Sequence, residues 1–386
     1  MGSREIATPR VLVLASPIDG PGGIERVSRS CITAFGERYG PERVGLLTLG
    51  KSPDGLPCRV LDAGKPFSGQ VGPLAKIRFV WKTLSAARRW KKNLVLVVAH
   101  PHLASVAAMA SRITGAPFAV WCHGSESWGS ISRLAKVGLQ RASLVFAPSR
   151  FTAREVERAA NLPDSSVRVV HHGLGQELFG DDSYPQNERA PALIAVARLT
   201  SEHAYKGIDS LLYAWPRVTE RVPEARLWVV GDGSDVGRLK SIAESLGLNG
   251  KVQFFGQVTD GELTGLYSSA SVFALPSRSQ IEPRAQGEGF GVVYIEAGAA
   301  GLPVIAAQGA GTEDAVEHGL TGLLIDPANQ KELEEAIVLL LTDKALALRM
   351  GEEGRRRAGS EFSYDAFADR ICGVVDELFS IKTENL

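Results

Sequence analysis

Short apolar runs rich in β-branched residues alternate along this chain with longer stretches whose apolar positions repeat at helical spacing. Strands of a parallel sheet that is covered on both faces are almost continuously apolar, and each leads into a crossover helix. The first half of the sequence therefore predicts a doubly wound parallel α/β sheet. Its predicted strands lie at residues 11–16, 44–50, 94–100, 118–124, 144–149 and 167–173.

A polar stretch at residues 180–191 interrupts this alternation, and its composition is typical of a linker. A chain of 386 residues is also too long for one typical core. We therefore expect two Rossmann-like domains, 1–187 and 188–363, that face each other across a ligand-binding cleft. The predicted strands of the second domain lie at residues 192–198, 227–233, 252–258, 272–277, 303–307 and 322–326.

Composition excludes several classes of protein. The sequence holds no run of about 18 apolar residues, and its apolar N-terminal segment is too short for a signal peptide. Four cysteines lie far apart without a CxxC pair, which argues against a disulfide framework and a zinc site. We expect a cytoplasmic protein with reduced thiols and no metal.

The two halves carry opposite charge, although the whole chain is neutral. Residues 1–187 hold 24 basic and 14 acidic side chains, whereas the rest holds 19 basic and 29 acidic ones. No acidic residue occurs between Ala63 and Ser125. This asymmetry indicates an anionic partner for the first domain.

The strongest candidate for chemistry is the glycine-rich segment at residues 287–297, in which Glu288 and Glu296 flank the start of a predicted helix. Its glycines, Gly287, Gly289 and Gly291, let the backbone approach a ligand, and the helix N-terminus offers N–H groups to a phosphate. With a helix that begins near Phe290, Glu296 lies about two turns into it. The alternative is a solvated loop glutamate followed by an ordinary helix glutamate.

Two cations are predicted close to the same place. Arg198 ends the first strand of the second domain, and Lys206 precedes a glycine and a new helix. Ligands of doubly wound sheets bind at the carboxyl ends of strands, where both cations could neutralise a leaving diphosphate without Mg²⁺. Alternatively, both are solvated surface charges.

The first domain offers weaker signals. Gly20, Gly22 and Gly23 follow its first strand and lead into a helix that begins near Ile24, without the GxGxxG spacing. The end of the second strand lacks the acidic residue that binds ribose in dinucleotide enzymes, so NAD is disfavoured. The glycines either contact phosphate or acceptor, or merely form a tight turn.

His123 directly follows a predicted strand and precedes Gly124, a position from which an imidazole can hydrogen-bond a sugar or a leaving phosphate. Histidines are also common as buried structural residues. Position alone does not decide between these roles, because four other histidines lie near similar points of the chain: His100, His102, His171 and His172.

Taken together, the motifs resemble those of the retaining glycosyltransferases of the GT4 family, which have the GT-B fold. They are GPGGIER, HGSES, VVHHG, ARL with HAYKG, GDG and GEGFGVVYIEA, in this order along the chain. The resemblance is most specific over residues 192–327. It implies that the last amphipathic helix, 364–386, returns to the N-terminal domain, and that the reaction needs no cofactor.

The resemblance also assigns roles to residues. It implies that Arg198 and Lys206 hold the diphosphate of the donor, that Glu296 binds its ribose and that Glu288 binds the transferred sugar. Substrate would further contact Gly22 and Gly23, the backbone of Gly289, Phe290, Gly291 and Val292, and, at the nucleobase, Gly256 and Val258. His123 would lie near the reacting carbon.

The predicted function is transfer of a hexose from GDP-mannose or a UDP-hexose to a hydroxyl of a glycan, glycolipid or lipid-linked acceptor. The acceptor would attack from the face that the diphosphate leaves, so that configuration is retained. No pair of carboxylates flanking a scissile bond, as a hydrolase needs, is evident. A nucleotide-sugar epimerase of the same fold and a non-catalytic nucleotide-sugar-binding protein stay open as alternatives.

Two segments qualify this interpretation. The loop at 276–291 is longer than the shortest form in the family and brings Arg278 and Arg284 near the donor site. Residues 74–93 mix large apolar side chains with seven cations, a composition suited to the anionic inner face of a membrane. The alternative for 74–93 is a solvated helix that packs its aromatic residues on the sheet. Nucleic acid is disfavoured, because no binding motif is present.

Overall fold

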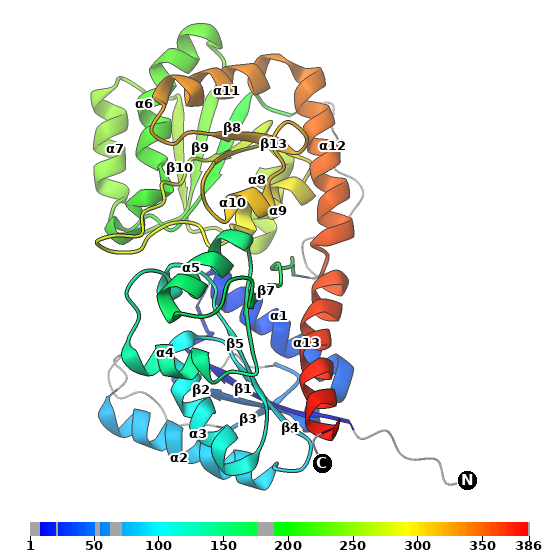
Figure 1. The fold of residues 1–386 in the computed structure, drawn as a ribbon. Helices are drawn as coiled ribbons and strands as arrows, with labels where there is room; N and C mark the ends of the chain where they lie inside the picture. The colour runs from blue at the N-terminus through cyan, green and yellow to red at the C-terminus, as the bar shows by residue number, and fades with distance from the viewer. Residues whose placement is uncertain (1–7, 21, 51–54, 62–71, 176–188, 385–386) are drawn as a thin grey trace. The chain divides into compact units, whose positions relative to one another are not determined.

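The computed structural model describes residues 8–20, 22–50, 55–61, 72–175 and 189–384, which form two compact units. Unit 1 comprises Met1–Gly175 with Tyr364–Leu386, and unit 2 comprises Gln176–Ser363. The predicted domain boundary between residues 187 and 188 falls within 176–188, which lie outside the described residues. Each unit contains one parallel sheet with helices on both faces (Figure 1).

The sheet of unit 1 has the order β3-β2-β1-β4-β5-β6-β7, and every pair of neighbours is parallel. Its strands are β1 (Arg10–Ala15), β2 (Val44–Thr48), β3 (Arg59–Val60), β4 (Leu94–Val98), β5 (Phe118–Trp121), β6 (Leu144–Ala147) and β7 (Val167–Val169). The sequence predicted six of these strands and missed β3. This edge strand is exposed on both of its residues and so has no apolar run.

Helices cover both faces of this sheet. They are α1 (Gly23–Tyr39), α2 (Pro73–Arg89), α3 (Ala104–Thr114), α4 (Arg133–Gln140), α5 (Arg150–Ala160) and α13 (Tyr364–Glu384), with short 3₁₀ turns η1 (Pro41–Arg43), η3 (Pro101–Leu103) and η4 (Ser125–Ser127). On one face α1 contacts α13, and on the other α2, α3, α4 and α5 follow one another. The Tyr39 hydroxyl donates to the Cys372 carbonyl oxygen at 2.9 Å, which ties α13 to α1.

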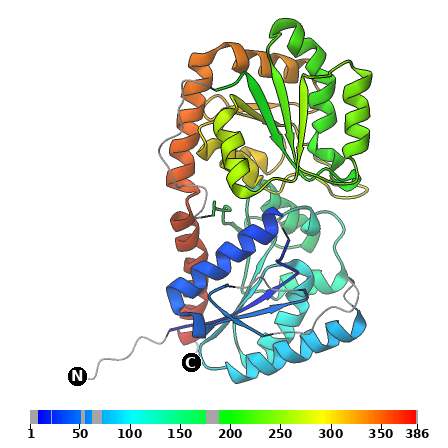
Figure 2. The same ribbon diagram turned by 180° about the vertical axis from the view of Figure 1, so that it is seen from behind.

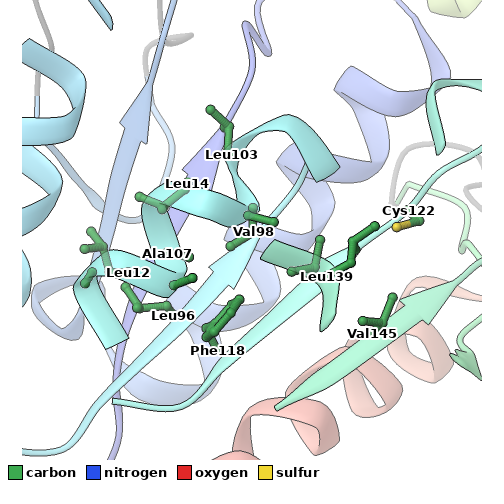
Figure 3. Close-up of a cluster of buried hydrophobic side chains, with 14 of the residues drawn as sticks. Leu12, Leu14, Leu96, Val98, Leu103, Ala107, Phe118, Cys122, Leu139 and Val145 are labelled. Atoms are coloured by element: carbon green, nitrogen blue, oxygen red, sulfur yellow. The ribbon is translucent and has the colours of Figure 1, made fainter. Parts of the chain in front are cut away.

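The core between the sheet and α2 to α5 consists of every second residue of the strands. Leu12 and Leu14 of β1 and Leu96 and Val98 of β4 point into this cluster, where Phe118 joins them (Figure 3). The helices add Phe79, Ala107, Leu139 and Val156. This period of two follows from the pleat of a strand, and the intervening residues face α1 and α13. There Trp121 stacks on Phe367 with ring centroids 5.9 Å apart.

The sheet of unit 2 has the order β10-β9-β8-β11-β12-β13 and is also parallel throughout. All six strands were predicted: β8 (Ala192–Val196), β9 (Arg226–Val230), β10 (Val252–Gly256), β11 (Val272–Leu275), β12 (Val304–Ala307) and β13 (Gly322–Ile325). Figure 2 shows this sheet from behind, with helices on either side. The helical elements are η6 (Ser201–Lys206), α6 (Ile208–Arg221), α7 (Val236–Ser245), α8 (Asp260–Ser269), α9 (Val292–Ala299), α10 (Thr312–Ala315), α11 (Gln330–Thr342) and α12 (Lys344–Glu361).

The order of strands in unit 2 reverses at β8. The chain runs outward from β8 through β9 to β10, then returns to β11 on the other side of β8. Such a switch point leaves a crevice beyond the carboxyl ends of the two strands, where open α/β sheets bind ligands. In the part of the chain that the structure describes, no helix is both long and apolar enough to span a bilayer.

Candidate active site

Two segments meet at the switch point of unit 2: η6, which follows β8, and the loop that follows β11. The Arg278 backbone N–H donates to the Tyr205 carbonyl oxygen at 2.7 Å. Gly207 has φ +79°, and a Cβ atom there would lie 2.4 Å from the Pro276 carbonyl oxygen. Only glycine permits this approach, so the sequence itself fixes the two segments against each other.

Lys206 and Glu288 form an ion pair across this contact, between Nζ and Oε1. The Ser277 hydroxyl donates to the same carboxylate oxygen at 3.1 Å. Burial lowers the pKa of Lys206, but Glu288 and Tyr205 raise it, and the net pKa lies above its ordinary value. Lys206 is therefore a cation held at the crevice by Glu288, whose side chain is only 9% exposed.

Arg198 lies exposed just beyond the end of β8. Burial lowers the pKa of His203, and the charges of Arg198 and Lys206 lower it further. His203 is thus a neutral neighbour of two cations, and its Nδ1 lies 2.7 Å from the Thr200 hydroxyl oxygen. Two cations at one strand end form a positive site suited to an anion such as a diphosphate.

The helix after the glycine-rich loop starts later than the sequence predicted. Gly291 has φ +93° and α9 begins at Val292 rather than near Phe290. A left-handed residue cannot belong to a right-handed helix, so the first turn is displaced by two residues. Glu296 is therefore the fifth residue of α9, a little over one turn from its start rather than two.

Glu296 is buried, and one of its oxygens, Oε2, accepts a hydrogen bond of 3.3 Å from the Tyr267 hydroxyl. Phe290 is 1% exposed and packs edge-on against Phe362, with ring centroids 5.6 Å apart. Its backbone rather than its ring is therefore the part that suits ligand binding. Val292, directly after Gly291, is half-buried.

The segment around Gly311, which follows β12, also holds the loop between β11 and α9 in place. The Gly311 N–H donates to the Glu288 carbonyl oxygen at 3.0 Å. A Cβ atom at Gly311 would lie 2.1 Å from the Gly289 carbonyl oxygen. Gly289 and Glu288 are consequently fixed by a glycine that the sequence analysis did not single out.

Gly256 and Val258 lie at the carboxyl end of β10, two strands from β8. Gly256 has φ +69°, and its carbonyl oxygen accepts from the Gly231 N–H at 2.9 Å. Val258 is half-buried. Both residues thus belong to the same edge of the sheet as Arg198 and Lys206.

The two arginines of the 276–291 loop differ in their surroundings. Arg278 Nη2 donates to the Ala204 carbonyl oxygen at 2.7 Å and pairs with Asp209 at 3.0 Å. Arg284 is 70% exposed and lies 3.6 Å from an exposed Glu202. Arg278 therefore fastens η6 and the start of α6 to the loop, whereas Arg284 lies at the surface.

In unit 1, the ring of His123 is 3% exposed and both its nitrogens have partners. Nε2 lies 3.2 Å from the Ala99 carbonyl oxygen, and Nδ1 lies 3.3 Å from His172 Nε2. The carbonyl can only accept, which assigns the proton of His123 to Nε2 and leaves Nδ1 to accept from His172. Burial, with a smaller contribution from His100, lowers the pKa of His123 to about 3. The imidazole is neutral.

The glycines of the first loop lead directly into α1, for which Gly22 is the N-cap and Gly23 the first residue. The Arg29 guanidinium donates to the carbonyl oxygens of Ile18 and Gly20 at 2.7 and 2.9 Å. This arginine, the seventh residue of α1, holds the loop in place and was not predicted.

Comparison with known proteins decides the family. Residues 21–177 match Glycosyltransferase Family 4, and residues 180–357 match Glycosyl transferases group 1. A GDP-mannose-dependent alpha-(1-6)-phosphatidylinositol monomannoside mannosyltransferase of Mycolicibacterium smegmatis is 30% identical over 298 residues, which cover 73% of this chain and 75% of that protein. The chain belongs to the GT4 family of glycosyltransferases.

Other proteins agree with the GT4 assignment. The Mycobacterium tuberculosis (strain H37Rv) protein of the same name is 31% identical over 265 residues, covering 64% of this chain and 66% of the relative, just under two thirds of its length. Among solved structures, HepE of Anabaena in complex with UDP and glucose has a TM-score of 0.75 at 21% sequence identity. The match covers 95% of this chain and 99% of HepE. Sucrose-phosphate synthase of Thermosynechococcus elongatus has a TM-score of 0.77 at 22% sequence identity. The match covers 97% of this chain and 100% of the synthase. These structures confirm the GT-B fold.

The sequence analysis did not single out four residues of this candidate site in unit 2: Ser277, Tyr267, Asp209 and Gly311. Ser277 lies directly before the predicted loop arginine, and the end of a strand is a signal that could have singled it out. Tyr267 lies on α8, and only the folded structure brings it to Glu296. Within the described residues, no group of three or more His, Cys, Asp or Glu side chains could hold a metal ion.

Proposed function

We propose that this protein transfers a hexose from a nucleoside-diphosphate sugar to a hydroxyl of a glycan, glycolipid or lipid-linked acceptor. The observation that carries the proposal is the pairing of Lys206 with Glu288 beside Arg198, at the switch point of a parallel sheet. An anion-binding pair of cations and a carboxylate that can accept from sugar hydroxyls are what a nucleotide sugar requires. Membership of the GT4 family supports this chemistry.

GDP-mannose is the first donor to test, because the mycobacterial relatives are named GDP-mannose-dependent mannosyltransferases. UDP-hexoses are the alternative donors. The same names make a phosphatidylinositol mannoside the first acceptor to test. A glycolipid acceptor also fits a cytoplasmic protein that reaches the inner face of a membrane.

In the proposed reaction, Arg198 and Lys206 bind the diphosphate, and Glu296 accepts hydrogen bonds from the ribose hydroxyls. Glu288 accepts from hydroxyls of the hexose, and backbone groups of residues 289–292 contact the hexose and phosphate. Gly256 and Val258 lie against the base. Gly22 and Gly23 contact phosphate or acceptor.

The bond between the anomeric carbon and the diphosphate oxygen breaks while the acceptor oxygen bonds to the same carbon from the same face. The acceptor proton passes to a diphosphate oxygen, and the hexose keeps its anomeric configuration. The two cations stabilise the charge that develops on the leaving group, which in our proposal replaces a metal ion. His123, which the resemblance places near the reacting carbon, does not take the acceptor proton in this proposal, because burial lowers its pKa to about 3 and both its ring nitrogens have partners within unit 1.

The test is an assay of the full chain with GDP-mannose and a phosphatidylinositol mannoside in the presence of EDTA. We expect acceptor-dependent release of GDP, and a product whose new linkage has the donor's configuration by NMR. Donor isomerisation without acceptor would establish an epimerase, and binding without turnover of any donor would establish a non-catalytic protein. Loss of activity in EDTA, or a glycosyl adduct trapped on Glu288, would contradict the proposed mechanism.

A further inference from the structure

The segment at residues 197–209 carries both cations of the proposed diphosphate site, Arg198 near its start and Lys206 near its end. It follows β8, which lies between β9 and β11 in the sheet. Apart from η6 and the start of α6, this fully described segment has no regular structure. A short 3₁₀ helix has poor hydrogen-bond geometry, so contacts with the loops after β9 and β11 decide where the two cations lie.

Two glycines of the loop after β9 hold the start of this segment. A Cβ atom at Gly231 would lie 1.8 Å from the Ala197 carbonyl oxygen. A Cβ atom at Gly233 would lie 2.4 Å from the Leu199 carbonyl oxygen. Both glycines have positive φ, +129° and +152°, which side chains other than glycine rarely adopt. The backbone on either side of Arg198 is therefore fixed against a loop that only glycine allows to come so close.

Asp235 extends this contact from the N-cap of α7. Its backbone N–H donates to the Leu199 carbonyl oxygen at 2.8 Å. An N-cap aspartate usually accepts from the backbone of its own helix, but in α7, all of which the structure describes, the side chain makes no such bond. The carboxylate instead accepts from Arg238, at 2.8 Å from Nε and 2.6 Å from Nη2. This bidentate pair compensates for the burial of Asp235, which is 7% exposed.

Arg238 also reaches the far end of the segment. Its Nη1 lies 3.9 Å from Oδ2 of Asp209, three residues after Lys206. The hydrogen bonds from Asp235 raise the pKa of Arg238, burial lowers it, and the charges of Asp235 and Asp209 raise it further. On its other side, Asp209 has Arg278 Nη2 at 3.0 and 3.2 Å from its two oxygens. The Asp209 side chain is only 16% exposed, so both guanidinium groups lie against a largely buried carboxylate.

Charges of alternating sign thus connect the loop after β9 with the loop after β11, across the start of α6. In this order they are Asp235, Arg238, Asp209 and Arg278. We name these four side chains the charge chain. With the two glycine contacts, the charge chain holds residues 197–209 at both ends, at Leu199 and at Asp209.

We propose that Asp209 and Arg238 are positioning residues for the donor, which hold residues 197–209 so that Arg198 and Lys206 reach one diphosphate together. This role rests on the proposed function and adds two residues to it. Small displacements of a binding group are costly for a ligand that needs defined geometry. Ion pairs as exposed as that of Arg238, whose side chain is 45% exposed, contribute little to stability. Their loss should therefore be visible in ligand binding more than in unfolding.

The experiment compares the affinity of the full chain for GDP and UDP with its affinity for guanosine and uridine, in EDTA. Calorimetric titration measures the diphosphates, and competition against them measures the nucleosides. A nucleoside keeps the base and the ribose but has no phosphate, so the ratio of the two affinities isolates the contribution of the diphosphate contacts. A purely structural role would lower both affinities alike and leave this ratio unchanged.

Four variants test the charge chain. Arg238→Met breaks it between α7 and α6, Arg238→Lys keeps one cation in place, and Asp209→Asn releases both arginines. The double variant Asp209→Asn/Arg238→Met tests whether Arg238 acts through Asp209. The matched control is Arg217→Met, which also removes an ion pair between residues three apart, with Glu220 on α6. Thermal melting shows that each variant is folded.

Arg238→Met should weaken binding of the diphosphate by about threefold to fivefold, and Asp209→Asn by about tenfold. Neither should change the affinity for the nucleoside. Arg238→Lys should recover part of the loss, since an ammonium pairs with a single carboxylate at a time. The double variant should bind like Asp209→Asn alone, because two changes in one chain of contacts are not additive. Arg217→Met should match the wild type.

Three results would overturn the positioning role: unchanged diphosphate affinity in Asp209→Asn, equal losses for diphosphate and nucleoside, or fully multiplied losses in the double variant. Failure of the wild type to bind either diphosphate is a different result. It would contradict the proposed function itself, and this inference with it, before any variant is compared.

Discussion

Lys206 and Glu288 lie 82 positions apart in the sequence, yet their side chains pair at the carboxyl edge of the unit 2 sheet. Lys206 ends η6 after β8, and Glu288 belongs to the loop after β11, so adjacent strands bring them together. Both side chains are largely buried, with exposed fractions of 17% and 9%. A charged pair in this position is available to bind a ligand and also stabilises the fold, and the two contributions can be separated.

Lys206→Met should reduce both activity and stability. Loss of a positive charge at the leaving group should lower kcat/KM by about 100-fold to 1,000-fold. The uncompensated Glu288 should lower the free energy of unfolding by about 3 kcal/mol. Transferase kinetics and urea unfolding measure the two effects.

The double variant Lys206→Met/Glu288→Gln distinguishes the contributions. With no buried charge left uncompensated, it should regain most of the lost stability. Activity should stay low, because neither the cation nor the carboxylate is present. Recovery of activity together with stability would mean that the pair is structural only.

Glu296→Gln should raise the KM for the donor by about tenfold to 100-fold while leaving kcat nearly unchanged, since a charge-assisted hydrogen bond to ribose is lost in ground and transition states alike. Tyr267→Phe serves as the control. It removes the hydroxyl that donates to Glu296 but keeps the carboxylate, so a rise in KM of only a few-fold is expected. A larger effect of Tyr267→Phe than of Glu296→Gln would contradict ribose binding by Glu296.

Arg278→Ala should impair catalysis although its side chain is directed to Ala204 and Asp209. Without this anchor η6 is free to shift, and a displacement of Lys206 should raise the KM for the donor by about tenfold. Arg278→Lys should restore part of the loss, because one ammonium can reach one acceptor. Arg284→Ala, in the same loop but at the surface, should match the wild type, and equal effects of the two alanine variants would refute the positioning role.

His123 should make the stability of the protein depend on pH. Burial lowers its pKa to about 3, below the unfolded value of about 6.5. Between these values the unfolded chain binds a proton that the folded chain does not, so stability falls as pH falls, by about 1.4 kcal/mol per pH unit. Above pH 6.5 this contribution is constant.

The measurement is urea unfolding of wild type and His123→Asn from pH 7 to pH 5. Asparagine cannot take up the proton, so the free energy of unfolding of the variant should fall by about 2 kcal/mol less than that of the wild type over this range. His318→Asn, which alters an exposed histidine of unit 2, is the matched control. Identical slopes for wild type and His123→Asn would show that His123 is not buried in its neutral form.

Much of the fold follows from the sequence because both faces of these sheets are covered. Such strands must be apolar, so β1 and β8 are evident as short β-branched runs. The edge strand β3 was missed for the converse reason, since its two residues are exposed. The start of α9 was misplaced because only the backbone angle of Gly291 decides which glycine ends the loop.

The candidate site could be proposed from the sequence where its residues follow strands or lie in glycine-rich loops. Arg198, Lys206 and Glu288 were singled out on this ground, and the structure brings Lys206 and Glu288 together. The hydrogen bond from Tyr267 to Glu296 joins two helices, and no local pattern encodes it. The burial of His123 depends on Ala99 and His172, which follow other strands, so its neutral state emerges only from the folded unit.

The central claim, that Lys206 holds the diphosphate of a nucleotide, is tested most directly by calorimetric titration of GDP and UDP in EDTA. The comparison is between wild type and Lys206→Met/Glu288→Gln, whose stability should be close to that of the wild type. We predict that the wild type binds one equivalent of at least one nucleotide, and that the double variant binds it about 100-fold more weakly. Equal affinity of the two proteins, or no binding by the wild type, would contradict the account.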